Sequence, residues 1–109
     1  MRRGYDDVVI TCPVTVPYVR YSIRGVHWFL AQALAELVKA SGVAKEAMDG
    51  LCVSSFTLTP DTAIGFTQHV GVSPRWLDYV PLGGASGVVC LRRAARAVQT
   101  GDADVVACI

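Results

Sequence analysis

The sequence has no large excess of positive or negative charge and no long apolar run. Its 109 residues include ten basic and nine acidic side chains, which leave a net charge of +1 and give no bulk electrostatic reason to expect nucleic-acid binding. No apolar run reaches the length of a membrane span. Asp6 and Asp7 follow the basic residues Arg2 and Arg3, and no apolar region with a small-residue cleavage site comes next. We therefore expect a cytoplasmic protein without a membrane span or a nucleic-acid partner.

The sequence also lacks the cysteine spacing of a metal site. Its four cysteines lie far apart in apolar segments, with no CxxC pair and no Cys/His cluster: Cys12, Cys52, Cys90 and Cys108. We interpret them as small buried side chains in a reducing compartment. A dinucleotide-binding loop is missing too, because Cys12-Pro13-Val14-Thr15 occupies the place where G-x-G-x-x-G would follow the first predicted strand. No metal and no bound cofactor are expected.

What the chain does contain is an alternation of short apolar strands and amphipathic helices. Its length and its 52% hydrophobic content suit one small domain, residues 1–109. β-branched and apolar runs predict strands at residues 8–12, 51–56, 76–80 and 105–109. Apolar positions three and four apart predict helices from Val26 to a stop at Gly42, at residues 63–70, and beyond Gly83-Gly84 to a stop at Gly101.

The order β-α-β-α-β-α-β predicts an α/β fold with a mostly parallel sheet and helices on both faces. Ser22 is the expected N-cap of the first helix, residues 43–48 are expected to form a short helical turn, and Asp61-Thr62 opens the second helix. Because the last apolar strand ends with the chain at Ile109, we expect the domain to be part of a longer chain.

Two histidines and a group of arginines invite a functional interpretation. His27 borders the apolar stripe of the first helix without a partner four residues on, and is interpreted as a boundary residue. His69 lies in the last turn of the second helix, where it interacts with the carbonyl end. Arg92, Arg93 and Arg96 lie on the outer side of the last helix. They form either a solvated helix face or a contact with a phosphate-bearing ligand.

The most informative stretch is the turn before the last helix. An apolar strand with Pro81 at its end runs into Gly83-Gly84-Ala85-Ser86-Gly87, and the helical pattern follows without a spacer. Paired glycines let the backbone turn tightly and let a ligand approach without meeting a Cβ. The first N–H groups of the helix favour a partial negative charge. Such an elbow suits an oxyanion or a nucleophile, and its tip holds no obvious nucleophile. The predicted substrate- and oxyanion-binding residues are Gly83, Gly84, Ala85 and Ser86.

Four stretches of the chain carry a family resemblance that spans nearly its whole length. They are Val26-His27-Trp28-Phe29-Leu30-Ala31, Asp49-Gly50-Leu51, Gly83-Gly84-Ala85-Ser86-Gly87, and Ala97-Val98-Gln99-Thr100-Gly101-Asp102-Ala103-Asp104-Val105-Val106. The last resembles the A-[IV]-x-x-G-x-A-D-V-V motif of the thiolase superfamily. In this order the four stretches resemble the amino-terminal segment of that superfamily, and more narrowly the thiolase-like proteins related to sterol-carrier-protein-x thiolases and steroid side-chain aldolases.

The resemblance implies a three-layer βαβαβαβ half-domain that is incomplete at its C-terminus. It implies a coenzyme A thioester as substrate rather than a bound cofactor, and a place in lipid metabolism. It also implies a homodimer formed through Trp76–Val80 and, in the aldolase branch, a small OB-fold partner protein. The family's catalytic histidine and second cysteine belong to a carboxyl-terminal half, so this segment alone is not expected to complete a catalytic cycle.

At the nucleophile the chain departs from the family. Thiolases carry a reactive cysteine in C-x-S-G or C-A-[ST]-G at this turn, and aligning Ala85-Ser86-Gly87 with that motif puts Gly84 in the cysteine's place. Cys90 lies almost two helical turns further on, where we expect burial. Ser86 is expected to cap the helix rather than attack a substrate. The sequence therefore assigns no catalytic residue.

Three functions remain open at this point. The first is an acyltransferase of the acetyl-CoA acetyltransferase type. The second is retro-aldol cleavage of a β-hydroxyacyl-CoA, which needs no acyl-enzyme and can use the N–H groups of the Gly83-Gly84-Ala85 turn to stabilise an enolate. The third is a non-catalytic thiolase-fold subunit that binds acyl-CoA or serves in assembly.

Overall fold

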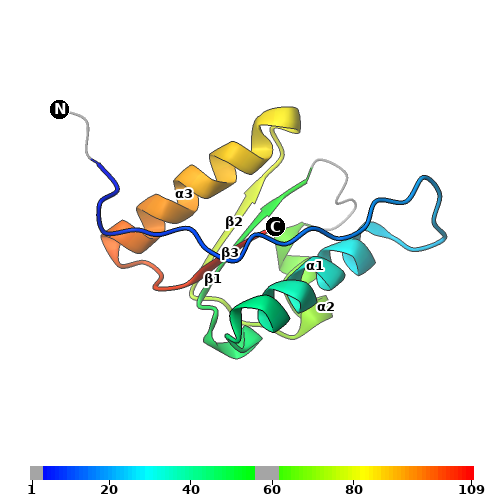
Figure 1. The fold of residues 1–109 in the computed structure, drawn as a ribbon, viewed down its shortest axis with the longest axis horizontal. Helices are drawn as coiled ribbons and strands as arrows, with labels where there is room; N and C mark the ends of the chain where they lie inside the picture. The colour runs from blue at the N-terminus through cyan, green and yellow to red at the C-terminus, as the bar shows by residue number, and fades with distance from the viewer. Residues whose placement is uncertain (1–3, 56–61) are drawn as a thin grey trace.

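A computed structural model describes residues 4–55 and 62–109 (Figure 1). Its elements, in chain order, are α1 (Val26–Ser41), the 3₁₀ turn η1 (Lys45–Ala47), β1 (Gly50–Ser54), α2 (Ala63–Val70), β2 (Trp76–Val80), the 3₁₀ turn η2 (Gly83–Ala85), α3 (Ser86–Thr100) and β3 (Val106–Cys108). Every element expected after residue 25 is present. The basic residues at positions 2 and 3, the strand end at Phe56 and the helix opening at Asp61 lie outside the described residues.

β1 is the central strand of a parallel sheet with the order β2-β1-β3. Cys52 of β1 is the register partner of Asp78 in β2 and of Cys108 in β3. The connection through α2 leads to one side of β1, and the connection through α3 returns to the other side. Crossovers of one hand that run in opposite directions place their helices on opposite faces. The predicted α/β class, with a parallel sheet and helices on both faces, is confirmed for the described residues.

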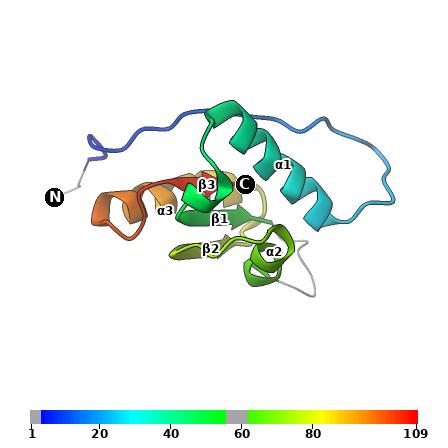
Figure 2. The same ribbon diagram turned by 90° about the horizontal axis from the view of Figure 1, so that it is seen from below.

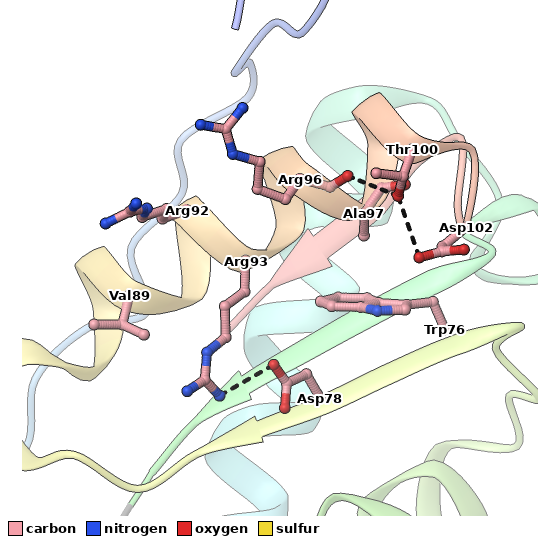
Figure 3. Close-up of a pocket in the computed structure, with 9 residues that line it drawn as sticks. All are labelled: Trp76, Asp78, Val89, Arg92, Arg93, Arg96, Ala97, Thr100 and Asp102. Atoms are coloured by element: carbon pink, nitrogen blue, oxygen red, sulfur yellow. Dashed lines mark hydrogen bonds and ion pairs between the residues drawn. The ribbon is translucent and has the colours of Figure 1, made fainter. Parts of the chain in front are cut away.

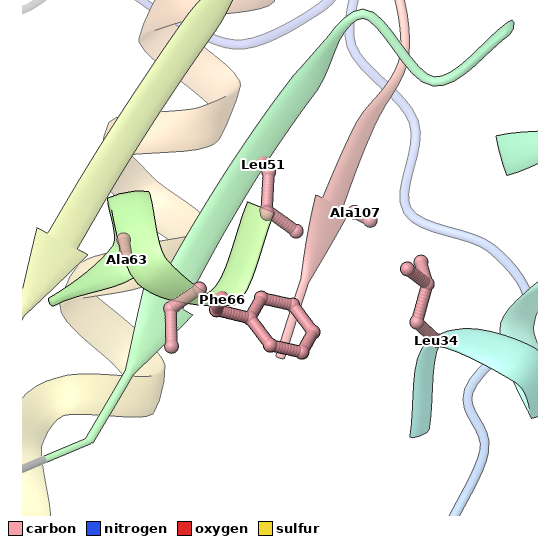
Figure 4. Packing of buried hydrophobic residues seen from close by; sticks show 6 residues of the cluster. Leu34, Leu51, Ala63, Phe66 and Ala107 are labelled. Atoms are coloured by element: carbon pink, nitrogen blue, oxygen red, sulfur yellow. The ribbon is translucent and has the colours of Figure 1, made fainter. Parts of the chain in front are cut away.

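The core has one hydrophobic cluster on each face of the sheet, because successive residues of β1 point in opposite directions. Leu51 and Val53 pack on the side of α1 and α2 (Figure 4), with Leu34, Ala63, Phe66 and Ala107. Cys52 points toward α3 and packs against Cys90. Phe66 is fully buried, which is worth about 1.5–3 kcal/mol relative to an exposed ring. Figure 1 shows α3 on one side of the sheet and α1 with α2 on the other.

The predicted first strand, residues 8–12, is wrong. The side chains of Val9 and Ile10 are 86% and 75% exposed, and residues 8–12 have no regular secondary structure. Cys12 has a φ of 55°, a left-handed conformation that interrupts an extended run. The β-branched pattern gives a strand propensity but does not supply a pairing partner, and residues 8–12 pair with none of the three strands of the described sheet. The described sheet is therefore β-α-β-α-β, and residues 4–25 cross the molecule from the end of α3 to the start of α1 (Figure 2).

The start of α1 also differs from its prediction. The helix begins at Val26 after Gly25, which makes no side-chain cap. The Ser22 hydroxyl instead accepts a hydrogen bond from the Arg24 N–H at 3.0 Å, a local turn that competes with capping. The end agrees with the sequence, because Gly42 closes α1 with a φ of 70°. No helix within residues 4–55 and 62–109 combines the length and apolarity needed to cross a membrane.

Candidate functional site

The predicted strand, turn and helix around the paired glycines are confirmed. β2 ends at Val80, η2 covers Gly83–Ala85, and α3 begins at Ser86. We call residues Gly83 to Ser86 the elbow. Gly83 has a φ of 67°, which a side chain would strain. A Cβ built on Gly83 or Gly84 would meet nothing within 4 Å. The glycine pair is exposed, so a ligand can reach its backbone.

Ser86 has a structural role that differs from the predicted cap. It has helical φ and ψ of −57° and −44°, and its N–H donates to the Gly83 carbonyl. Its hydroxyl is buried and accepts a hydrogen bond from the Leu82 N–H at 2.7 Å. These bonds close the turn and engage both the N–H and the hydroxyl of Ser86. The N–H groups of Gly83, Gly84 and Ala85 precede the first closed turn and have no partner inside it, so they are the backbone donors available to a ligand at the elbow.

Cys90 is buried, as the sequence predicted, and its thiol donates to the Cys52 carbonyl at 3.3 Å. The neighbouring Cys108 and Cys52 thiols, together with burial, raise the pKa of Cys90 far above its ordinary value. A thiol held in this state is neither ionised nor accessible at neutral pH. Cys90 therefore does not replace the nucleophile that Gly84 lacks.

The structure brings together three cysteines that the sequence separates. Cys52 and Cys108 are register partners on β1 and β3, and Cys90 of α3 packs on the same face. All three are free thiols, and the hydrogen bond with the Cys90 thiol lowers the pKa of Cys108. Within residues 4–55 and 62–109, no three His, Cys, Asp or Glu side chains have the arrangement of a metal site. The sequence could not show that these cysteines meet, because their spacing along the chain does not reveal the register of the parallel strands.

His27 and His69 also come together, with their ring centroids 5.6 Å apart. His27 in addition lies 6.5 Å from the ring of Phe66. The pair joins α1 to α2, on the face of the sheet opposite α3. It is thus a contact between helices on the face that does not carry the elbow helix.

A second surface feature is an open groove beside α3 with a volume of ≈ 580 Å³ (Figure 3). It is lined by residues of β2, of α3 and of the loop after α3: Trp76, Asp78, Val89, Arg92, Arg93, Arg96, Ala97, Thr100 and Asp102. Arg93 forms an ion pair with Asp78 at 3.2 Å. The arginines identified in the sequence therefore border a concave surface, and β2 supplies groove residues that the sequence did not indicate.

Comparison of the chain with protein-family models, with curated proteins and with solved structures gives no match. The family resemblance and the role of the elbow therefore both remain predictions from sequence motifs. The chemistry that the elbow itself offers consists of exposed backbone donors at residues 83–85, a buried serine and no thiol at the tip.

Proposed function

We propose that this chain is the amino-terminal part of a thiolase-like acyl-CoA enzyme that works without a covalent acyl intermediate. The observation that carries the proposal is the exposed Gly83-Gly84 bend at the start of α3, with open space around both glycines. The bend lies at the carboxyl end of β2, and ligands of open α/β sheets bind outside the carboxyl ends of the strands. The four sequence stretches that resemble thiolases supply the substrate class.

The state of the thiols favours retro-aldol cleavage over thiolysis. Thiolysis through an acyl-enzyme needs a thiolate at the tip, where this chain has Gly84. In a retro-aldol reaction a base takes the β-hydroxyl proton, the bond between Cα and Cβ breaks, and its electron pair forms the thioester enolate. The N–H groups of Gly83 and Gly84 would stabilise the enolate oxygen. The elbow offers no side chain that takes up a proton at neutral pH, so the base must come from elsewhere in the protein.

The test is to supply the full-length protein with a β-hydroxyacyl-CoA and, separately, with a β-ketoacyl-CoA and free coenzyme A. We expect release of an aldehyde or ketone in the first assay and no thiolysis in the second. Thiolysis would contradict the proposal in favour of an acyltransferase. No turnover of either substrate would contradict it in favour of a non-catalytic acyl-CoA-binding or assembly subunit.

A matched pair of variants connects the activity to the elbow. Gly84→Val places a branched side chain in the space where the thioester would lie, and we expect turnover to fall more than tenfold. Gly87→Ala adds a methyl group that also meets nothing within 4 Å, but one position inside α3, and should leave turnover within about twofold. Thermal unfolding of both variants, which reports folding, should stay close to that of the unmodified protein.

A further inference from the structure

The groove beside α3 has chemically different ends (Figure 3). Arg92 and Arg96 lie one turn apart on α3, whereas Thr100 and Asp102 lie at and beyond its C-terminal end. The ring of Trp76 lies nearer the Thr100 and Asp102 end. An α-helix rises about 1.5 Å per residue, so Arg92 and Thr100 are roughly 12 Å apart along the axis. A ligand that used the whole groove would carry an anion, a flat ring and a hydrogen-bond donor in that order.

The basic end suits a phosphate group. Like charges four residues apart on a helix repel one another, and an anion between them relieves that repulsion. Among the described residues, Arg92 forms no hydrogen bond or ion pair. Arg96 is held in position, because its guanidinium lies 3.9 Å from the centroid of the Tyr5 ring and donates to the Gly4 carbonyl at 3.2 Å. A positioned guanidinium loses less entropy when it binds an anion.

The middle of the groove suits a planar ring. Arg93 and Asp78 offset each other's charge through their ion pair. The half-buried ring of Trp76 and the side chains of Val89 and Ala97 supply the apolar lining. Aromatic side chains of this kind are platforms on which nucleic-acid bases stack.

The far end suits a hydrogen-bond donor. The Asp102 carboxylate is exposed and accepts one hydrogen bond from the Thr100 hydroxyl at 3.2 Å. An ionised carboxylate accepts several hydrogen bonds, so it can also take one from an amino group. The same charge would repel a second phosphate group and thereby fix the direction of the ligand.

We propose that this groove binds a nucleoside phosphate whose base carries an amino group. The phosphate lies between Arg92 and Arg96, the base lies on Trp76, and the amino group donates to Asp102. The volume of ≈ 580 Å³ is within the range of small-molecule sites, about 300–1,000 Å³. No residue of the elbow lines the groove, so the inference does not depend on the proposed thioester chemistry.

The probe is adenosine monophosphate, followed by the fluorescence of Trp76. Trp28 is first replaced in a Trp28→Phe background, because it is the only other tryptophan of the chain. We expect saturable quenching, with a dissociation constant raised about tenfold by Arg92→Gln and at least threefold by Asp102→Ala. Arg20→Gln is the matched control, since Arg20 stacks on Tyr21 in the loop before α1, and should bind like the background protein.

Two further probes measure what each part of the ligand contributes to binding: inosine monophosphate, which lacks the amino group, and inorganic phosphate, which lacks the nucleoside. Both should bind more weakly than adenosine monophosphate. The inference is overturned if adenosine monophosphate gives no saturable signal, if inorganic phosphate binds as tightly, or if Arg92→Gln leaves the affinity unchanged. Should Trp28→Phe fail to fold, the indole N–H signal of Trp76 in the NMR spectrum of the unmodified protein gives the same titration.

Discussion

Asp49 connects three separate parts of the chain through its carboxylate. The N–H of Val105 donates to it at 2.8 Å and that of Asp104 at 2.9 Å, while the Arg75 guanidinium lies at 3.1 Å. These bonds join the start of β1 to the residues before β3. The Val105 N–H is the main reason why the pKa of Asp49 lies below its ordinary value of 3.8. The next residue is Gly50, where a Cβ would meet Val106 Cγ2 at 2.7 Å, so the strands can approach only without a side chain.

Asp49→Asn should lower the free energy of unfolding by about 1–2 kcal/mol at pH 7, because the amide oxygen is a weaker acceptor than the carboxylate. The folded-state pKa lies below the unfolded one. The contribution of Asp49 is therefore complete above pH 3.8 and is lost as the pH falls through the lower, folded-state value. Urea unfolding at pH 7 and pH 3 measures both effects. Glu46→Gln, at an exposed acid, is the control, and an unchanged pH dependence in Asp49→Asn would contradict this role.

The two elbow glycines differ in what they contribute to folding. Gly83 has a positive φ, and Gly84 does not. Gly83→Ala should therefore cost about 1–2 kcal/mol, the penalty for a side chain in the left-handed region. Gly84→Ala should be neutral or stabilising by up to about 1 kcal/mol, since it restricts only the unfolded chain. If both variants changed the thermal unfolding temperature equally, that result would contradict the positive φ of Gly83.

At the scale of elements, α3 packs closely on the sheet because its inner face is built from small side chains. Cys90, Ala94 and Ala97 are buried and face β1, β2 and β3. Cys90 lies at the centre of this face, where its thiol donates a hydrogen bond to the Cys52 carbonyl. The helix that carries the elbow is therefore fixed to all three strands, which positions the Gly83 and Gly84 N–H groups.

This packing predicts the order in which the thiols react with iodoacetamide. Cys12 and Cys108, the two partly exposed thiols, should be alkylated in the folded protein. Cys52 and Cys90 should react only when the protein unfolds, because they are buried and the pKa of Cys90 is raised. Mass spectrometry of peptides at successive times gives the order. Rapid modification of Cys90, with loss of turnover in Cys90→Ala, would show that Gly84 is not the residue at the active tip.

Sequence patterns predicted those elements whose signals are local. Helical periodicity and glycine stops found α1, α2 and α3, and the glycine pair found the elbow. The prediction of a strand at residues 8–12 failed because β-branching gives only a propensity, whereas a strand also needs a neighbouring strand to pair with, which the local sequence does not reveal. The contact between Cys52 and Cys108 and the groove formed by Trp76 with Arg93 could not be predicted, because both depend on register and on how a helix crosses the sheet.

At the scale of the whole molecule, the edge strand β2 is the feature that bears on association with another chain. Within the described residues, β2 is an edge strand in the order β2-β1-β3, and an unpaired edge is a template for another strand. The homodimer through Trp76–Val80 that the thiolase resemblance implies would use this edge, and it stays a prediction. A small OB-fold partner remains a separate expectation of the aldolase branch, which copurification with the full-length protein would test.

The proposed dimer can be measured without a substitution. Sedimentation of the full-length protein should give twice the monomer mass at micromolar concentration. Hydrogen exchange should show protection of the outward N–H groups of Trp76–Val80 that weakens on dilution, whereas N–H groups inside α3 should stay protected. A monomer at every concentration, or protection of β2 that does not change on dilution, would contradict an interface at this edge.

The central claim is that the elbow backbone binds the thioester without a covalent bond. The most direct measurement is an NMR titration of the protein with an acyl-CoA, combined with its intact mass. We predict that the largest amide shifts occur at Gly83, Gly84 and Ala85 and that the mass does not change. Unchanged elbow amides with shifts elsewhere, or an added acyl mass on a cysteine, would contradict it.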